Sequence, residues 1–135
     1  MRTQRRTSMT DNTQQVTPFP YDGLTTYTQA SRLMRAGVNS STADFYIPQE
    51  GTTPRVVTLS LEEHRAYYPC WSLGRLLQVL PQTVRLENQV SDTALTLVVY
   101  PNNEIRYENG YDDLSFRSDS GLVECAVLAI ESLNK

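Results

Sequence analysis

One cysteine has neighbours suited to thiol chemistry. Cys70 precedes Trp71, and the only histidine of the chain, His64, stands six residues before it. A catalytic thiolate needs a lowered pKa, which a nearby histidine or a helix N-terminus supplies, and Asp112 or Asp113 would orient the imidazole. No glycine-rich elbow or other catalytic signature accompanies this pair. The other interpretation is a buried thiol beside a core tryptophan, with the histidine on the surface.

A second group of candidate residues is acidic. Glu104, Glu108, Asp112 and Asp113 surround the turn Asn109-Gly110. A calcium loop needs oxygen ligands at alternating positions and a bidentate glutamate near its end, and this segment lacks that spacing. One histidine and two distant cysteines do not make the usual four ligands of zinc. We therefore expect solvated carboxylates at strand ends, with no metal and no cofactor.

Aromatic side chains are the third candidate group. The chain has eight tyrosines and one tryptophan. Such side chains combine a large apolar area with a polar tip, which is typical of protein interfaces, but they are also ordinary residues of sheets. We expect Tyr67, Tyr68 and Tyr111 to be exposed because they fall in segments predicted as loops. Together with Trp71 they form the candidate protein-binding residues.

Charge is distributed unevenly along the chain. Its 12 Lys and Arg and 15 Asp and Glu residues give a net charge of −3. Residues 1–20 contain Arg2, Arg5 and Arg6 but few apolar side chains, so we expect a flexible polar arm followed by a single domain over 21–135. The remaining nine basic and fourteen acidic residues disfavour a nucleic-acid-binding face on that domain, although the arginines of the arm are candidate phosphate contacts.

The chain has no sequence signal for a membrane or for export. No run approaches the roughly 20 apolar residues of a membrane span, and the arginine-rich start is not followed by an apolar signal-peptide core. Cys70 and Cys125 fall in segments that look helical and buried, and two cysteines do not make a secreted disulfide scaffold. We expect a soluble cytoplasmic protein with reduced thiols.

The apolar spacing predicts three helices. Thr25 or Thr26 caps the first, which ends at a left-handed stop at Gly37. Ser72 caps the second, which carries a leucine stripe and stops before Pro81. The third follows a cap at Ser118 or Asp119 and has a broad apolar face from 122 to 133. Between the first two helices, 43–46 is predicted as a short turn that Ile47 and Pro48 end.

Alternation of apolar and polar residues predicts the strands. Candidate strands cover 55–61, 83–87, 94–100 and 104–108, and a short one includes Leu114 and Phe116. The segment 62–68 fits either a helix or a loop. Turns at 101–103 and 109–110 join the later strands into hairpins. The sequence thus predicts an α+β fold, with a mainly antiparallel sheet of three to five strands and about three helices largely on one face.

Two segments together resemble a known group of proteins. They are Thr42-Ala43-Asp44-Phe45-Tyr46, which follows Gly37, and Pro69-Cys70-Trp71-Ser72-Leu73, which opens a helix ending in Leu80-Pro81. With the C-terminal apolar helix, this pattern resembles small uncharacterised proteins of phages and mobile elements from gut bacteria. The likeness spans 25–135. Cys70 stands where the group has a small residue such as alanine, and the resemblance implies no activity.

These observations favour a non-enzymatic accessory protein of a phage or mobile element that binds another protein. Self-association through a sheet edge or a helix face belongs to the same class. The alternative is a small enzyme or enzyme inhibitor with a pocket near Cys70 and His64. A third hypothesis has the arginine arm hold nucleic acid while the acidic body faces a partner.

Overall fold

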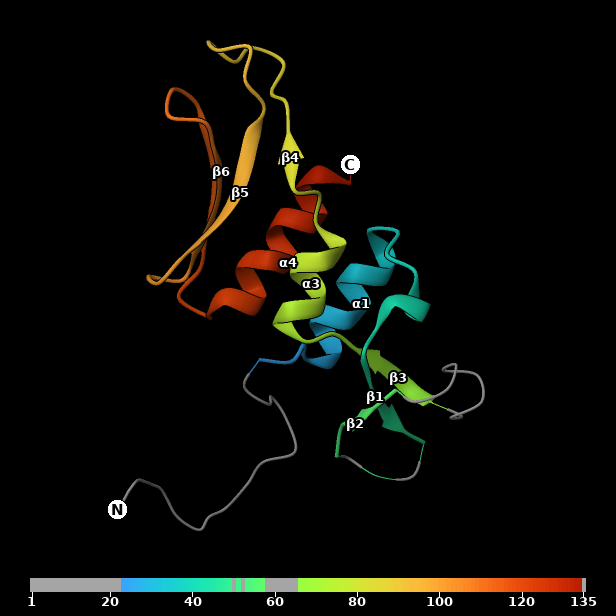
Figure 1. Cartoon of the computed structure of the whole chain (residues 1–135). Helices are drawn as coiled ribbons and strands as arrows, with labels where there is room; N and C mark the ends of the chain where they lie inside the picture. Colours follow the sequence, from blue (N-terminus) through green and yellow to red (C-terminus); the bar gives the residue numbers. More distant parts are fainter. Residues whose placement is uncertain (1–22, 50, 52, 58–65, 135) are drawn as a thin grey trace, which may run out of the picture.

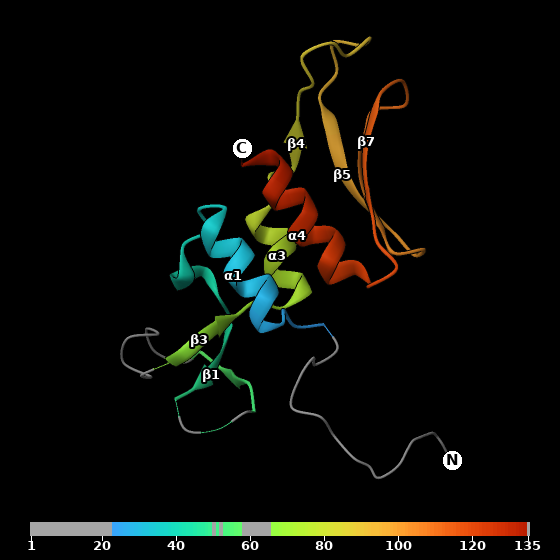
Figure 2. The ribbon, with the colours of Figure 1, turned by 180° about the vertical axis from the view of Figure 1, so that it is seen from behind.

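The fold is α+β, as the sequence predicts, and it contains two antiparallel sheets. The structure, a computed structural model, describes residues 23–49, 51, 53–57 and 66–134. Figure 1 shows a larger sheet on one side of the molecule, α4 and α3 beside it, and α1 on the far side. The view from behind in Figure 2 shows the same layers. A small sheet lies at one end of the helices.

The elements have the following bounds. The helices are α1 (Tyr27–Arg35), α3 (Leu73–Val79) and α4 (Leu122–Leu133), and a short 3-10 helix, η2, covers Ser40–Thr42. The small sheet has the order β2-β1-β3 and consists of β1 (Phe45–Pro48), β2 (Arg55–Val56) and β3 (Ala66–Cys70). The larger sheet has the order β4-β5-β6-β7 and consists of β4 (Thr83–Val84), β5 (Leu95–Tyr100), β6 (Glu104–Glu108) and β7 (Asp113–Arg117).

Helix α1 begins and ends where the sequence predicts. Thr26 accepts the backbone N–H of Gln29 at 3.1 Å, and the Gln29 side chain accepts that of Thr26 at 2.8 Å. This reciprocal cap satisfies two backbone donors that have no partner within the helix. At the other end Gly37 has φ 97°, and Val38 donates to the carbonyl of Leu33 at 3.0 Å. The predicted left-handed stop is therefore confirmed.

Helix α3 is confirmed and the start of α4 differs from the prediction. Ser72 caps α3, but the residue before α4 is Gly121, with φ 111° and no side-chain cap. The predicted caps, Ser118 and Asp119, both precede this position, and Ser118 still belongs to the strand region, where its N–H donates to the carbonyl of Asn103 at 3.2 Å and extends the pairing of β6 with β7. Its hydroxyl instead accepts the N–H of Ser120 at 3.0 Å. Helix α4 therefore begins a few residues later than the sequence predicts.

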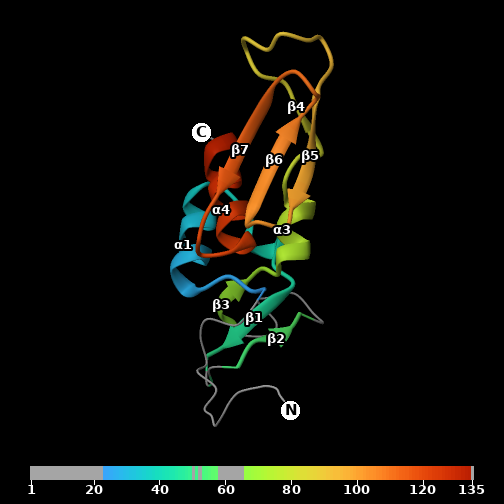
Figure 3. The same ribbon diagram turned by 90° about the vertical axis from the view of Figure 1, so that its left-hand side faces the viewer.

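The larger sheet contains the predicted hairpins. Strands β5, β6 and β7 pair as consecutive antiparallel neighbours, without a register shift. Asn103 adopts φ 56° in the predicted turn, a conformation that asparagine tolerates better than most residues. One face of the sheet packs on α4, which contacts both β6 and β7. Figure 3 shows the other face of this sheet as the outermost layer of the described molecule.

The small sheet corrects two sequence predictions. Residues 45–48, predicted in part as a turn, form β1, which pairs with both β2 and β3. Cys70, which the sequence places in a helical segment, is the last residue of strand β3. A proline fits in β3 because this strand lies at the edge of the sheet, where the missing N–H of Pro69 costs no ladder bond. Of the predicted strand 55–61, β2 covers the first two residues and 58–61 lie outside the described residues.

The core lies where the three α-helices meet. Helix α4 contacts α1 and α3 as well as the larger sheet, so it is central to the packing. Its buried residues are Cys125, Ala126, Val127, Ala129 and Ile130. Trp71 is the largest fully buried side chain among the described residues. None of the described helices has the length and apolar character that crossing a membrane requires.

Candidate functional site

Trp71 is held in the core by two threonines. Its indole Nε1–H donates to Thr42 Oγ1 at 2.9 Å. Its backbone N–H donates to Thr25 Oγ1 at 3.0 Å, and Thr25 returns a backbone hydrogen bond to the Trp71 carbonyl at 3.0 Å. Trp71 is fully buried, so it offers no area to a partner. This finding removes Trp71 from the candidate binding residues.

Asp44 links the same region to the start of α3. Its Oδ1 accepts the backbone N–H of Ser72 at 2.9 Å, and its Oδ2 accepts the Ser72 hydroxyl. Ser72 Oγ in turn accepts the N–H of Arg75 at 3.1 Å and caps the helix. The two segments that carry the resemblance therefore contact each other, through Thr42 with Trp71 and Asp44 with Ser72. Their residue types serve the packing of the fold.

The predicted thiol site does not have the properties of a nucleophile. Cys70 is fully buried and free of a disulfide. Burial, with a smaller contribution from the nearby charge of Asp44, raises the pKa of Cys70 to about 12. A thiol with this pKa carries almost no thiolate at neutral pH. His64 lies outside the described residues. Asp112 and Asp113 belong to the end of the larger sheet, far from β3 in Figure 3.

Two of the acidic candidates, Glu104 and Glu108, are engaged by neighbouring protein groups. Glu104 pairs with Arg106 at 2.9 Å and accepts the hydroxyl of Ser115, and the latter hydrogen bond is the main reason that its pKa is lowered. Glu108 pairs with Arg106 at 3.4 Å and accepts the hydroxyl of Tyr100, which raises the pKa of that phenol. Arg106 also stacks over the Tyr100 ring, 4.7 Å from its centroid.

These charges lie on the outer face of the larger sheet and largely neutralise one another. In this network Glu104 and Glu108 both direct their carboxylates at Arg106 or at a hydroxyl group. Among the residues that the structure describes, no group of three or more His, Cys, Asp or Glu side chains is placed to hold a metal ion.

Asp112 and Asn109 organise the far end of the larger sheet. We call this end the sheet tip and define it as residues 85–94 and 109–112. Asp112 Oδ2 accepts the backbone N–H groups of Val90 at 2.8 Å and of Ser91 at 3.3 Å. Asn109 Nδ2 donates to the carbonyl of Thr93 at 2.8 Å. The loop before β5 is thereby fastened to the turn between β6 and β7.

Further side-chain hydrogen bonds of Gln89 and Asn109 hold the loops of the tip. Gln89 Oε1 accepts the N–H of Leu86 at 2.8 Å, and its Nε2 donates to the carbonyl of Thr93 at 2.8 Å. Asn109 Oδ1 accepts the N–H of Tyr111 at 2.9 Å and that of Asp112 at 2.8 Å. The loops at the tip thus have defined backbone conformations.

The sheet tip displays two large side chains to solvent. Val90 is 81% exposed and Tyr111 is 77% exposed, the two highest values among the large hydrophobic residues described. Figures 1 and 3 show that the tip extends well beyond the helices. The backbone of Val90 is tied to the side chain of Asp112, the neighbour of Tyr111 along the chain. The tip is therefore our candidate functional site.

The remaining aromatic candidates lie elsewhere. Tyr68 belongs to β3, is 8% exposed and contacts the ring of Tyr27 edge to face at 5.0 Å, so it is a packing residue and not the exposed loop residue expected. The side chain of Tyr67 lies outside the described residues, as do Arg2, Arg5 and Arg6. Of the four aromatic candidates, Tyr111 is the one whose exposure is established. Val90 was missed because a lone valine in a polar loop gives no sequence signal.

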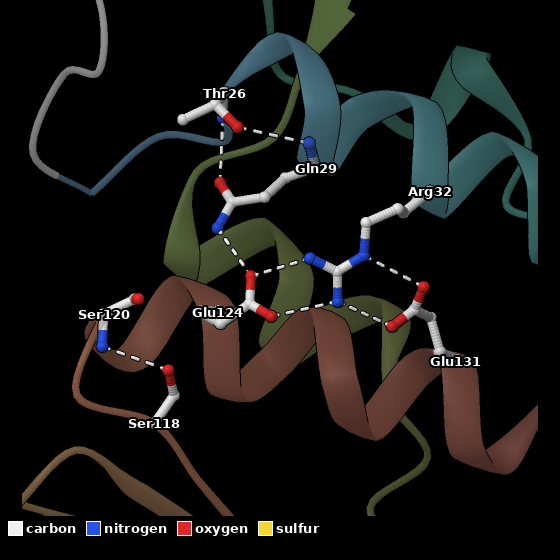
Figure 4. A network of polar contacts seen from close by, with 7 residues as sticks. All are labelled: Thr26, Gln29, Arg32, Ser118, Ser120, Glu124 and Glu131. Atoms are coloured by element: carbon white, nitrogen blue, oxygen red, sulfur yellow. Dashed lines mark hydrogen bonds and ion pairs between the residues drawn. The ribbon is translucent and has the colours of Figure 1, made fainter.

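A second polar cluster joins α1 to α4, as Figure 4 shows. Arg32 pairs with Glu124 at 2.9 Å and with Glu131 at 2.7 Å, and these contacts raise its pKa. Gln29 donates to Glu124 at 3.0 Å. The cluster borders a hollow of about 500 Å³ between the starts of the two helices. Because its charged groups already pair within the chain, we assign it to helix packing.

Comparisons with known proteins give no relative from which a function can be transferred. No family model, no curated protein and no solved structure matches the chain. The function therefore has to be argued from the geometry.

Proposed function

We propose that this protein acts by binding another protein through the sheet tip and does not catalyse a reaction. The observation that carries the proposal is the exposure of Val90 and Tyr111 on loops whose backbone is held by side-chain hydrogen bonds. Tyrosine is enriched among the residues that dominate binding energy in protein interfaces. The setting implied by the resemblance is that of an accessory protein of a phage or mobile element in the bacterial cytoplasm.

Preorganisation supports this function. A loop that must be ordered during binding loses conformational entropy, and the loss reduces affinity. The hydrogen bonds of Asn109 and Asp112 order the tip before a partner arrives. The neutralised outer face of the sheet is less suited to the role, because its charged groups would lose their present partners or their water.

The alternative of an enzyme or enzyme inhibitor near Cys70 has less support. Its thiol is buried, and its pKa is raised to about 12, which is the opposite of what activation requires. The carboxylate nearest in the hydrogen-bond network, Asp44, already binds Ser72 through both oxygens.

Affinity capture with matched variants tests the proposal. The full chain, carrying an affinity tag, is incubated with an extract of its native host, and the bound proteins are quantified by mass spectrometry. We expect a partner whose recovery falls about tenfold or more for the double variant Val90→Ser and Tyr111→Ser, because loss of a dominant tyrosine alone costs about 2 kcal/mol or more.

The matched control is Val56→Ser. Val56 is 59% exposed on β2, at the other end of the molecule, so its substitution has a similar chemical effect on the surface. We expect this variant to retain the partner. Equal recovery by the tip variant and the wild type, with both folded by circular dichroism, would contradict the proposal.

A further inference from the structure

The free edge of β7 has the features of a self-association surface. We infer that a second copy of this chain adds its own β7 to this edge in the antiparallel direction, centred on Ser115. The surface uses other residues than those of the sheet tip, so the inference goes beyond the proposed function.

Strand β7 is an available edge. It is the last strand in the order β4-β5-β6-β7, and it pairs with β6 over five residues without a bulge. Proteins usually protect edge strands by shortness, proline, charged side chains (lysine above all) or a bulge. The opposite edge, β4, is only two residues long, whereas β7, with the sequence DLSFR, has no proline, lysine or bulge, and its two charged side chains are of opposite sign.

Two backbone hydrogen bonds fix which backbone groups of β7 point outward. Asn109 N–H donates to the Asp112 carbonyl at 3.2 Å, and Ser118 N–H donates to the Asn103 carbonyl at 3.2 Å. In an antiparallel pair, hydrogen-bonded and non-hydrogen-bonded residues alternate along the strand. The even-numbered residues of β7 therefore form the backbone hydrogen bonds to β6. Asp113, Ser115 and Arg117 direct their N–H and C=O groups to the free edge.

The charges of β7 select one register for two copies. In this register Ser115 of one copy lies opposite Ser115 of the other. Asp113 of each copy then lies opposite Arg117 of the other copy, so that the two-fold axis generates two such pairs. Opposite charges at directly facing positions stabilise a strand pair, and like charges destabilise it. A parallel pair in register would place Asp113 against Asp113 and Arg117 against Arg117. Neither side chain forms an ion pair with a described residue in the single chain.

Helix α4 fits the same two-fold arrangement. It contacts both β6 and β7. Because adjacent strands are about 4.8 Å apart, a helix centred over these two strands lies about 5 Å from an axis at the free edge. The two copies of α4 would then be about 10 Å apart, which is the distance of packed helices.

A hollow lined by both apolar and polar residues lies at this position. It measures about 520 Å³, and Phe116 of β7 and Leu128 of α4 contribute its apolar lining. The second copy would bring its own Leu128 and Phe116 to the hollow. In the resulting eight-stranded sheet the two tips point in opposite directions, so the dimer would present two partner-binding ends.

Sedimentation of the full chain tests the inference. We expect the wild type to form a dimer that dissociates on dilution. In Asp113→Arg, arginine faces Arg117 of the second copy, and we expect the dimer dissociation constant to rise about tenfold or more. This substitution should not destabilise the monomer, because residue 113 lies opposite Glu108 of β6. The control Thr96→Arg adds a positive charge at an exposed position of β5 and should leave the dimer dissociation constant unchanged.

Cross-linking tests the register. The full chain carrying Ser115→Cys, treated with a short thiol cross-linker, should give a covalent dimer, whereas Thr96→Cys should not, because β5 is about 12 Å from the axis. The native cysteines are buried. A monomeric wild type, a dimer that Asp113→Arg does not weaken, or equal cross-linking at 96 and 115 would overturn the inference. Variants Val90→Ser and Tyr111→Ser should remain dimeric, so failure of the tip proposal is recognised separately.

Discussion

Replacing Asp44 by alanine tests whether the contact between the two motif segments stabilises the fold. The substitution removes both acceptors of Ser72, one for its backbone N–H at 2.9 Å and one for its hydroxyl. Hydrogen bonds to a charged group contribute about 1.5–3 kcal/mol each, and two bonds to one residue are not additive. We therefore expect the free energy of unfolding to fall by about 3 kcal/mol.

A double-mutant cycle separates this contact from the helix cap. Ser72→Ala removes both the cap of α3 and its bond to Asp44, so we expect a loss of about 1–3 kcal/mol. Once Ser72 lacks its hydroxyl, removal of Asp44 costs less, and the coupling energy should be at least about 1 kcal/mol.

Urea unfolding followed by fluorescence measures all four stabilities. Trp71, the only tryptophan of the chain, is fully buried, so its emission reports directly on this region. Strict additivity of the two substitutions, or a loss below about 1 kcal/mol for Asp44→Ala, would refute the reasoning.

Two further predictions concern Cys70 and Arg32. A thiol reagent at pH 7 should label Cys70 far more slowly in the folded protein than in urea, and equal rates would contradict its burial. Burial raises the pKa of Cys70 from 9.0 to about 12, so this thiol ionises at a lower pH in the unfolded chain than in the folded protein. Its contribution to the free energy of unfolding is therefore full below pH 9 and is lost as the pH approaches 12. Cys70→Ala should therefore lose less stability than the wild type between pH 8 and 11. Arg32→Met removes the charge that Glu124 and Glu131 share, and should lower the free energy of unfolding by about 2 kcal/mol. The exposed neighbour Arg35→Met should change it by less than about 0.5 kcal/mol, and equal effects of the two in urea unfolding would argue against the pairing.

Local signals made much of the secondary structure predictable. Thr26, Gly37 and Ser72 act through contacts within a few residues, which a sequence displays directly. The hairpins of the larger sheet follow from alternation and from turns at 101–103 and 109–110 for the same reason.

Tertiary contacts explain the failed predictions. The cap of α4 was misplaced because Ser118 continues the pairing with Asn103, 15 positions away. Strand β1 was missed because its short sequence does not indicate a strand by itself, and its longer pairing is with β3, a segment that contains Pro69 and that also lacks a clear strand pattern. The division into two sheets likewise depends on contacts between distant segments.

The candidate site was predictable only in part. Tyr111 was singled out correctly as an exposed tyrosine, whereas Tyr68 and Trp71 have the same chemistry and are buried. Amphipathic aromatic residues suit both a core and an interface, so residue type alone does not decide exposure. The role of Asp112 as an acceptor for Val90 depends on two loops meeting, which the sequence does not display.

Site-specific photo-cross-linking tests the central claim most directly. A photoreactive phenylalanine analogue is placed at Tyr111 and, as the control, at Tyr27, which is 59% exposed on α1. After irradiation in the native host, position 111 should yield a discrete adduct with a second protein and position 27 should not. Absence of an adduct at 111, or the same adduct from both positions, would contradict a partner at the sheet tip.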